Sequence, residues 1–372
     1  MTRVLHVMDE LRASGAEMML GTAAGLWADH GVSCDVVATG ANRGAYWPVL
    51  EAAGYGVHHL PFEGSLRFLR HYAALIRSGP YDVVHVHTER AFVYKCIVAR
   101  LAGARVVRTV HNAFPFEGRL AQRRAYQRRL ARAVGTRFVA IGATVAENER
   151  ERFSNPTHRI DNWIDVARFV PPTPAARESR RRRFGLSDGV VTVVTVGNCS
   201  PIKNHAGLLE ALARIDDVDW ALLHVGQEDH KHVERHLASS LGVEQRCWFL
   251  GRTDPLDALH AADLYTMPSL YEGLGLSTVE ALATGLPIVL TDVPGNRDLR
   301  GMADRMIWSA TSADDLSVAL RTMMHTVIDD ETDDAAARRA QHATVAERYS
   351  PEAGVAAYCR LYMAGRDNLS TR

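Results

Sequence analysis

Pro268-Ser-Leu-Tyr-Glu-Gly-Leu-Gly-Leu-Ser-Thr-Val-Glu-Ala-Leu-Ala-Thr-Gly-Leu-Pro287 contains a glycine turn between two segments of regular structure. Before the turn, residues 264–267 form a short apolar run typical of a buried strand, and residues 276–286 show the apolar pattern of a helix. Another apolar run follows at residues 287–290. A strand, a helix and a further strand in this order form the repeating unit of parallel sheets.

The same unit recurs along the rest of the chain. Strands are predicted at residues 4–8, 34–38, 83–86, 106–110 and 138–141, and again at 190–196, 221–225, 248–250, 264–267 and 287–290. Between the two series, Val170-Pro-Pro-Thr-Pro174 and the charged run at 177–183 indicate an interdomain linker. Because 372 residues exceed the size of one ordinary core, we predict an α/β fold with two Rossmann-like parallel-sheet domains.

The composition is that of an ordinary globular protein. The chain has 43 basic and 43 acidic side chains, so it lacks the basic bias of a nucleic-acid-binding protein, and no nucleic acid is expected as a partner. The five cysteines are scattered without a CxxC pair, which favours free thiols in the cytoplasm. We expect neither a signal peptide nor a membrane span, because no apolar run is long enough.

Glycine-rich loops that follow a strand and begin a helix are where open α/β sheets bind ligands. In the quoted stretch Glu272 precedes the turn and Glu280 lies in the next helix, so both carboxylates could accept hydrogen bonds from the hydroxyls of one sugar. The backbone N–H groups from Gly273 to Leu276 can hold sugar or phosphate oxygens. A dinucleotide site is the alternative interpretation, but the G-x-G pattern lacks its third glycine.

A second loop of this kind, Ser14-Gly-Ala-Glu17, follows the first predicted strand. At Gly15 the backbone can approach an anion at the start of a helix. A simple helix cap explains the same residues equally well.

At these positions the chain resembles the family-four retaining glycosyltransferases of GT-B fold, in which two Rossmann-like domains face a cleft. The E-x7-E pattern from Glu272 to Glu280, followed by Ala-Leu-Ala-Thr-Gly-Leu-Pro, is the most specific part. Ser14-Gly-Ala-Glu17 resembles the family's G-G-x-E loop, with Ser14 in place of the first glycine. Val196-Gly-Asn-Cys-Ser-Pro-Ile-Lys-Asn204 resembles its V-G-R-x4-K donor loop. Residues 82–87, 109–112 and 162–169 also match, although Trp163 stands where a glycine is usual.

The resemblance implies three parts of the chain. Residues 1–168 would form the acceptor-side domain, and residues 169–350 the nucleotide-sugar-binding domain. Residues 351–372 would form a final helix that crosses back to the N-terminal domain.

The resemblance also implies a donor site built mainly by the second domain. The residues expected to bind the nucleotide sugar are Gly15, Asn198, Lys203, Arg252, Glu272, Gly273, Leu274, Gly275, Leu276 and Glu280. Lys203 would contact the diphosphate, Glu280 the ribose, and Glu272 the transferred sugar. Asn198 stands where the family usually has an arginine, so Arg252 is the next candidate for the diphosphate. The donor would be UDP-linked, and no further cofactor is expected.

The implied reaction transfers a hexose-type sugar, with retention, to a hydroxyl of a small-molecule, natural-product, lipid-linked or glycan acceptor. His111, Lys203 and Glu272 are the expected catalytic residues, with His111 near the reacting carbon. No nucleophile is matched, so front-face substitution is implied, and Lys203 with the helix N-termini would neutralise the leaving diphosphate without a metal ion. A nucleotide-sugar epimerase, a phosphorylase and a non-catalytic nucleotide-sugar-binding partner are the alternatives.

Two groups of histidines have competing explanations. His85 and His87 point to the same face of a strand, but no third ligand is evident, so packing or contact with the acceptor is favoured over a metal site. His230, His232 and His236 contain an i, i+4 pair, for which an exposed helix face is favoured over zinc.

The chain from Arg119 to Arg132 places Arg124, Arg128 and Arg132 on one helix face. A solvated face is favoured there over a weak peripheral contact with the inner face of the membrane. As a weaker hypothesis, Asp9, Glu10, Glu89 and Glu117 favour a cationic acceptor such as an amino sugar. The sequence leaves the oligomeric state undetermined.

Overall fold

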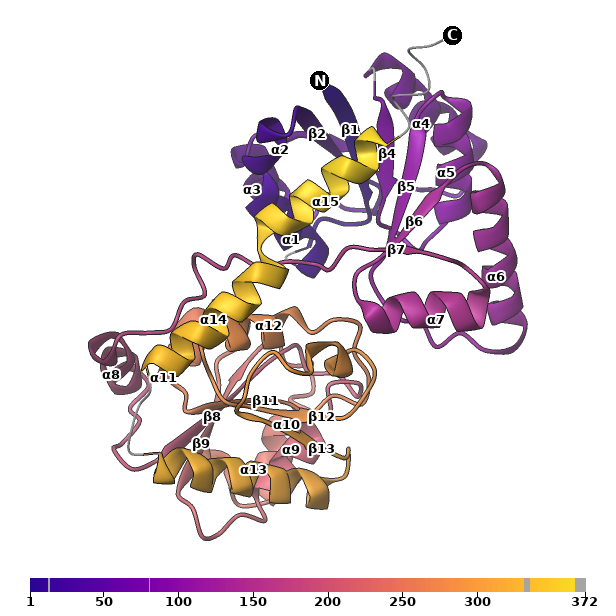
Figure 1. Ribbon diagram of the computed structural model, residues 1–372. Helices are drawn as coiled ribbons and strands as arrows, with labels where there is room; N and C mark the ends of the chain where they lie inside the picture. Colours follow the sequence, from indigo (N-terminus) through magenta and orange to yellow (C-terminus); the bar gives the residue numbers. More distant parts are fainter. Residues whose placement is uncertain (13, 80, 331–334, 365–372) are drawn as a thin grey trace. The chain divides into compact units, whose positions relative to one another are not determined.

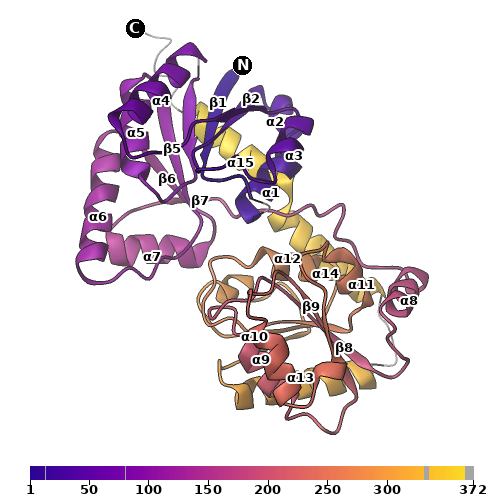
Figure 2. The same cartoon turned by 180° about the vertical axis from the view of Figure 1, so that it is seen from behind.

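The chain folds into two α/β units, which we describe from a computed structural model covering residues 1–12, 14–79, 81–330 and 335–364. Unit 1 contains Met1–Ile164 and the segment from Tyr349 onward, and unit 2 is Asp165–Arg348. The sequence placed the first boundary after residue 168 and the return after residue 350. In each unit helices cover the faces of one sheet (Figures 1 and 2).

Unit 1 is built on a parallel sheet of seven strands in the order β3-β2-β1-β4-β5-β6-β7. The strands are β1 (Thr2–Met8), β2 (Val32–Ala38), β3 (Gly56–His59), β4 (Val83–Val86), β5 (Arg105–Val110), β6 (Arg137–Ala140) and β7 (His158–Arg159). The helices are α1 (Gly15–Ala23), α2 (Leu26–Asp29), α3 (Trp47–Ala52), α4 (Leu66–Ser78), α5 (Phe92–Leu101), α6 (Gly118–Ala133), α7 (Ala143–Phe153) and α15 (Pro351–Met363). The predicted parallel sheet is confirmed, and β3 and β7 are additional edge strands.

The last helix, α15, completes the core of unit 1. It packs against α1 and α2, and Val355, Tyr358 and Tyr362 are buried in the same apolar cluster as β1. Gly354 lies directly against the ring of Trp163, where an added Cβ would come within 2.0 Å of a ring carbon. Trp163 stands where the family that the sequence resembles usually has a glycine, and here the glycine is on the facing helix instead.

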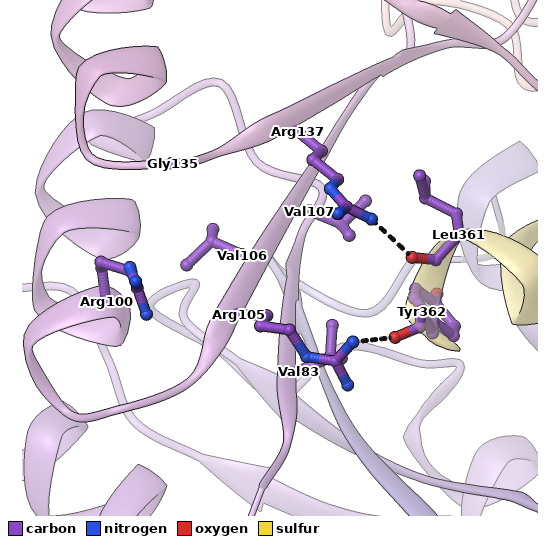
Figure 3. A pocket seen from close by; sticks show the side chains of 9 residues that line it. All are labelled: Val83, Arg100, Arg105, Val106, Val107, Gly135, Arg137, Leu361 and Tyr362. Atoms are coloured by element: carbon purple, nitrogen blue, oxygen red, sulfur yellow. Dashed lines mark hydrogen bonds between the residues drawn. The ribbon is translucent and has the colours of Figure 1, made fainter. Parts of the chain in front are cut away.

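Arginines at the amino-terminal ends of two strands hold the end of α15. Arg137 Nη1 donates to the Leu361 carbonyl at 3.1 Å, and Arg105 donates to the Tyr362 carbonyl (Figure 3). Cations favour the negative end of a helix and satisfy its last carbonyls. The small pocket around these residues contains none of the predicted site residues.

Unit 2 is built on a parallel sheet of six strands in the order β10-β9-β8-β11-β12-β13. The strands are β8 (Val191–Val196), β9 (Trp220–Val225), β10 (Cys247–Phe249), β11 (Leu264–Met267), β12 (Ile288–Thr291) and β13 (Met306–Ser309). The helices are α8 (Pro174–Arg183), α9 (His205–Leu212), α10 (Val233–Ser240), α11 (Leu256–Ala261), α12 (Leu276–Ala283), α13 (Ala313–Asp329) and α14 (Ala335–Tyr349), with short 3-10 turns at Glu244–Arg246 and Asn296–Leu299.

The five strands predicted for unit 2 are all present, and β13 is an additional strand at the sheet edge. The central strands β8 and β11 are neighbours, so the loops after them leave the same edge of the sheet. These are the two loops that the sequence predicts to bind the donor. Among the described residues, no helix is both long and apolar enough to span a membrane.

Candidate donor-binding and catalytic site

The two predicted donor loops of unit 2 lie side by side. The Leu270 N–H donates to the Ile202 carbonyl at 2.8 Å, and the Asn204 side chain donates to the Pro268 carbonyl at 3.2 Å. Asn204 adopts a left-handed backbone conformation with φ 54°, which asparagine tolerates better than most residues. These contacts bring the loop after β8 and the loop after β11 into one surface.

Lys203 and Glu272 meet in this surface. Lys203 Nζ lies 2.5 Å from Glu272 Oε1, and the same oxygen accepts a hydrogen bond from Ser269 Oγ at 2.7 Å. The Glu272 side chain is 10% exposed and that of Lys203 is 24% exposed, so the pair is largely shielded from water. A shielded pair of this kind presents both a cation and a carboxylate to a ligand.

Glu280 lies within the apolar helix α12 and is buried. Among the described residues, none hydrogen-bonds its carboxyl group, although Arg168 and Asp254 act on it electrostatically. Burial raises the pKa of Glu280 to about 8, and the charge of Arg168 offsets part of this rise. A buried carboxyl without a hydrogen-bond partner is costly, so it is a candidate to bind the hydroxyls of a ligand.

The start of α12 is held to the sheet by side chains. Ser277 Oγ donates to the Val196 carbonyl at 3.0 Å and lies 3.1 Å from the Tyr265 hydroxyl. This contact fixes the turn that contains Gly273, Leu274, Gly275 and Leu276 at the end of β8. The first N–H groups of a helix have no partner within the helix, so those of this turn can donate to a ligand, and the predicted backbone contacts to a sugar or phosphate remain predictions.

Asn198 and Arg252 occupy less central positions. Asn198 is exposed, and its Oδ1 accepts a hydrogen bond from the Gln227 N–H at 2.9 Å, which ties the β8 loop to the loop after β9. Gly226 permits this approach, because a Cβ there would come within 2.0 Å of the Gly197 carbonyl oxygen. Arg252 is exposed in the loop after the edge strand β10, two strands away from β8. Their contacts with a diphosphate remain predictions.

Gly15 begins α1, directly after the loop that follows β1 in unit 1. The preceding Ser14 hydrogen-bonds to the buried carboxyl of Glu17, and burial raises the pKa of Glu17. Ser14 precedes the helix but its side chain makes no capping hydrogen bond to a backbone N–H, and the contact of Gly15 with a phosphate remains a prediction.

His111, which follows β5, is the end of a chain of hydrogen-bonded histidines. Its Nε2 lies 2.9 Å from His87 Nδ1, and His87 Nε2 lies 3.0 Å from His6 Nδ1. Burial lowers the pKa of His111 and of His6 to about 3. These imidazoles are therefore neutral at physiological pH and act through hydrogen bonds rather than through charge.

His6 was missed by the sequence interpretation and His85 was only partly explained. His85 hydrogen-bonds to the Tyr362 hydroxyl at 2.6 Å through Nδ1 and to Thr109 Oγ1 at 2.7 Å through Nε2. His6 lies opposite His85 in the register of β1 and β4. Only the order of the strands in the sheet could have identified His6, and the sequence alone does not give that order. The sequence interpretation found no third ligand-type side chain beside His85 and His87, but His6 is one, because ligand atoms of all three lie within 4.8 Å of one another.

Lys95 is a further polar residue that the sequence interpretation did not assign. It lies on α5, is 1% exposed, and its Nζ donates to Thr39 Oγ1 at 2.8 Å and to Thr88 Oγ1 at 2.9 Å. Burial lowers its pKa to about 7. Thr39 and Thr88 follow β2 and β4, so this lysine braces the carboxyl edge of the unit 1 sheet.

The arginine stripe on α6 is solvated only in part: Arg132 is exposed, as the sequence predicts, whereas Arg124 is partly buried and Arg128 is buried. Arg128 is buried, and its Nε lies 2.7 Å from Glu149 Oε2, while Glu89 accepts from Arg108 at 2.7 Å and lies 3.7 Å from Arg124. The stripe is occupied by ion pairs because Glu89 and Glu149 fold against it. Glu89 is thereby neutralised, which removes it from the set proposed to attract a cationic acceptor.

The histidines at 230, 232 and 236 are exposed, as predicted. His232 is the residue directly before α10, and its Nδ1 lies 3.2 Å from Glu228 Oε2. Among the described residues, the groups of three or more ligand-type side chains close enough to share an ion do not include these histidines.

Comparison with known families covers nearly the whole chain. The model described as Glycosyltransferase Family 4 matches residues 13–197, and the model described as Glycosyl transferases group 1 matches residues 176–342. EpsF of Bacillus subtilis, provisionally named as a glycosyltransferase, is 30% identical over 319 residues, which cover 78% of this chain and 79% of EpsF. A UDP-Gal:alpha-D-GlcNAc-diphosphoundecaprenol alpha-1,3-galactosyltransferase of Escherichia coli is 29% identical, over 60% of this chain and 61% of its own.

Solved structures of glycosyltransferases share the fold. A glycosyltransferase from Rickettsia africae superimposes with a TM-score of 0.82 at 17% identity, covering 97% of this chain and 98% of that one. HepE from Anabaena, solved in complex with UDP, gives a TM-score of 0.81 at 20% identity, with 97% and 99% covered. The predicted GT-B fold is thus confirmed. The chain belongs to the glycosyltransferases of family four, the group 1 glycosyl transferases.

Proposed function

We propose that this glycosyltransferase transfers a hexose-type sugar from a UDP-linked donor to a hydroxyl group, with retention of the anomeric configuration. The observation that carries the proposal is the pairing of Lys203 with Glu272, which precedes α12, while the buried Glu280 lies about one turn into the same helix. A cation, two carboxyl groups and a set of free N–H groups match the diphosphate and the hydroxyls of a nucleotide sugar.

The identity of the nucleotide rests on what related proteins bind. HepE was solved with UDP and with UDP-glucose, and the Escherichia coli relative uses UDP-galactose according to its name. A Corynebacterium glutamicum relative is named as GDP-mannose-dependent, so the family also contains another nucleotide. We infer UDP as the first donor to test and GDP as the competitor.

In the proposed mechanism the Lys203 ammonium group and the helix N-terminus neutralise the charge that develops on the leaving diphosphate. The diphosphate oxygen accepts the acceptor's proton while the acceptor oxygen bonds to the anomeric carbon on the same face. Glu272 accepts hydrogen bonds from hydroxyls of the transferred sugar. The neutral His111 contributes a hydrogen bond to that sugar rather than a charge.

The acceptor class is inferred from names of relatives. The Escherichia coli relative acts on a diphosphoundecaprenol-linked sugar, and other relatives are named as D-inositol 3-phosphate glycosyltransferases. A lipid-linked or a small phosphorylated acceptor is therefore the first class to test. Neither requires a charged acceptor nitrogen.

The test incubates the full chain with UDP- and GDP-linked hexoses, with and without acceptors of both classes, and measures released nucleotide and new glycoside. A glycosyltransferase gives a glycoside with an equal amount of nucleotide, whereas an epimerase gives an isomeric donor and no nucleotide. A phosphorylase would require inorganic phosphate. A protein that binds UDP by calorimetry but gives no product with any pair would contradict the catalytic proposal.

A further inference from the structure

A second cluster of ligand-type side chains lies in unit 2, at the base of the loop that carries Lys203. Cys199 is in this loop, His205 is the first residue of α9, and His224 is on the neighbouring strand β9. Ligand atoms of all three residues lie within 4.8 Å of one another. Cys199 Sγ is 3.7 Å from His224 Nε2, and the rings of the two histidines are 4.6 Å apart at their centroids.

The histidines in this cluster are buried without hydrogen-bond partners for most of their nitrogens. His205 is 3% exposed and His224 is 2% exposed. Among the residues that the structure describes, three ring nitrogens have no hydrogen-bond partner: both nitrogens of His205 and the Nδ1 of His224. Buried polar atoms are normally satisfied, so three such nitrogens in one place indicate a missing ligand.

Glu234 adds a carboxylate to the same place. It lies on α10, is 8% exposed, and its buried Oε2 has no hydrogen-bond partner in the described part of the chain. It acts electrostatically on His224 and on Cys199. Cys199 contacts His224 Nε2 and hydrogen-bonds with Glu234, which lies beside the group of three without belonging to it. The remaining nitrogens, both of His205 and the Nδ1 of His224, have no partner among the described residues, and a cation would satisfy them.

The other histidine cluster of the protein provides a contrast. His6, His85 and His87 in unit 1 also bring ligand atoms within 4.8 Å. There, five of the six ring nitrogens are engaged with another histidine, Tyr362 or Thr109. An ion at that cluster would have to break these hydrogen bonds, whereas an ion at the unit 2 cluster would bind nitrogens that have no hydrogen-bond partner among the described residues.

We propose that Cys199, His205 and His224 bind a zinc ion, with Glu234, which lies beside Cys199, as the fourth ligand. Thiolate, imidazole and carboxylate are the ligands that zinc uses, and four of them complete the tetrahedral shell of a structural site. His224 Nε2 already lies 3.0 Å from the Gly197 carbonyl, so the unpartnered Nδ1 is the nitrogen of this ring that would bind the ion. Binding converts the Cys199 thiol to a thiolate and releases its proton.

The zinc would link four elements of unit 2. These are the β8 loop, which contains Cys199, the helix α9, which begins at His205, the strand β9, and α10, which contains Glu234. Lys203 and Asn198 lie on the β8 loop, so the ion would fix the loop that we propose to hold the diphosphate. The zinc itself takes no part in the transfer, and its presence can be tested without an activity assay.

The first experiment measures metal in the full chain. Protein incubated with zinc sulfate and then dialysed against a weak chelator is expected to retain one zinc per chain by mass spectrometry. Cobalt substituted for zinc is expected to give the charge-transfer absorption of a cobalt–thiolate bond. Less than half an equivalent of retained zinc, or a cobalt spectrum without the thiolate band, would overturn the proposal.

Matched variants locate the ion. Cys199→Ser should lose the thiolate band and the retained zinc, while Cys247→Ser, a half-buried cysteine on β10 of the same unit, should keep both. His236→Gln tests the exposed histidines of α10 as an adventitious site and should have no effect. If Cys247→Ser or His236→Gln loses the zinc while Cys199→Ser keeps it, the site has been placed wrongly.

Thermal unfolding gives an independent measurement when a variant folds poorly. Excess zinc should raise the unfolding temperature of the wild-type chain, because a ligand that binds only the folded state stabilises it. The rise should be absent in Glu234→Gln and in His205→Gln. An equal rise in these variants and in the wild-type chain would also contradict the proposed ligands.

Discussion

At the scale of single residues, the central feature is that Lys203 is already paired before any donor is present. Its ammonium group lies 2.5 Å from the Glu272 carboxylate. If the donor binds as proposed, its diphosphate takes Lys203 from Glu272, and the released carboxylate accepts hydrogen bonds from sugar hydroxyls. Donor binding would thus exchange one set of polar contacts for another, with few groups left unpaired in the free protein.

Lys203→Ala should lower kcat/KM by roughly tenfold to 150-fold. A charge-assisted hydrogen bond is worth about 1.5–3 kcal/mol, and each 1.36 kcal/mol corresponds to about a factor of ten in rate. Because Asn198 offers no second cation, Lys203→Ala with Asn198→Arg should recover part of the UDP affinity in calorimetry. Lys231→Ala, an exposed lysine of the same unit, is the control and should leave both quantities unchanged. If Lys203→Ala leaves kcat/KM nearly unchanged, the diphosphate binds elsewhere, and Arg252 is the next residue to test.

The buried Glu280 should make stability depend on pH. Its folded pKa of about 8 lies above the ordinary value of 4.5, so between these values the folded chain holds a proton that the unfolded chain has lost. The contribution of Glu280 to the free energy of unfolding is therefore largest below about pH 4.5 and falls as the pH rises to about 8. Denaturant unfolding of wild type and Glu280→Gln across this range should show the fall only in the wild type.

Glu244→Gln, at an exposed position of unit 2, is the matched control for that series and should follow the wild type. If Glu280→Gln shows the same fall with pH as the wild type, the carboxyl group is ionised in the folded chain. UDP should also protect the wild type more than Glu280→Gln, since the proposal places the ribose on this carboxyl group.

Sequence could identify Glu272, Glu280 and Lys203 as candidates because each stands in a motif with fixed spacing. It could not show that Lys203 and Glu272 are paired, because their contact depends on two loops that are 69 residues apart and pair through Leu270 and Ile202. His205 and His224 were not considered at all, since Cys199, His205 and His224 share no sequence pattern. The roles of Lys203, Glu272 and Glu280 in a bound complex remain predictions.

At the scale of elements, three neighbouring strands of unit 1 are linked by one hydrogen-bond chain. His6 on β1, His87 after β4 and His111 after β5 connect through their ring nitrogens. His6 Nε2, at the far end, is buried without a partner among the described residues. A buried N–H without an acceptor is rarer than a bare acceptor, so His6 should carry its proton on Nδ1.

This end of the chain sets the tautomer of His111. If His6 donates from Nδ1 to His87, then His87 donates from its own Nδ1 to His111 Nε2, and His111 carries its proton on Nδ1. Long-range nitrogen-15 NMR of histidine-labelled protein should show a single Nδ1–H tautomer for His111. His6→Phe should convert this signal into a mixture and lower kcat severalfold with little change in KM, whereas His58→Phe on β3 should change neither. A wild-type His111 protonated on Nε2 would contradict the inference.

The elements that sequence missed are short or lie at sheet edges. β7 (His158–Arg159) contains two residues and β3 (Gly56–His59) contains four. Neither has the run of β-branched residues that identifies a strand. The buried face of α6 was missed for another reason. Arg128 resembles a surface residue until Glu149, 21 residues later, folds against it.

At the scale of the whole molecule, the proposed mechanism predicts the stereochemistry of the product. The new glycosidic linkage should keep the anomeric configuration of the donor, because the matched motifs belong to retaining enzymes. Proton coupling constants of the purified product measure this directly. An inverted product would contradict the front-face mechanism and leave the fold assignment intact.

The same mechanism predicts that magnesium and manganese are dispensable. Lys203 and the N-terminus of α12 supply the positive charge that such an ion would otherwise provide. Adding either ion to protein freed of both should leave kcat unchanged, with zinc kept saturating so that the proposed Cys199 site stays filled. A strong dependence on magnesium would show that the diphosphate is neutralised in another way.

The return of the chain to unit 1 at Tyr349 has a consequence for biosynthesis. Unit 2 is continuous in sequence, whereas the core of unit 1 needs Val355, Tyr358 and Tyr362 from α15. During synthesis all residues of unit 2 are made before the helix that completes unit 1, so the apolar face of unit 1 that α15 covers stays open until then. A chain truncated before residue 351 would retain every residue of unit 2 but would lack the helix that packs against the ring of Trp163.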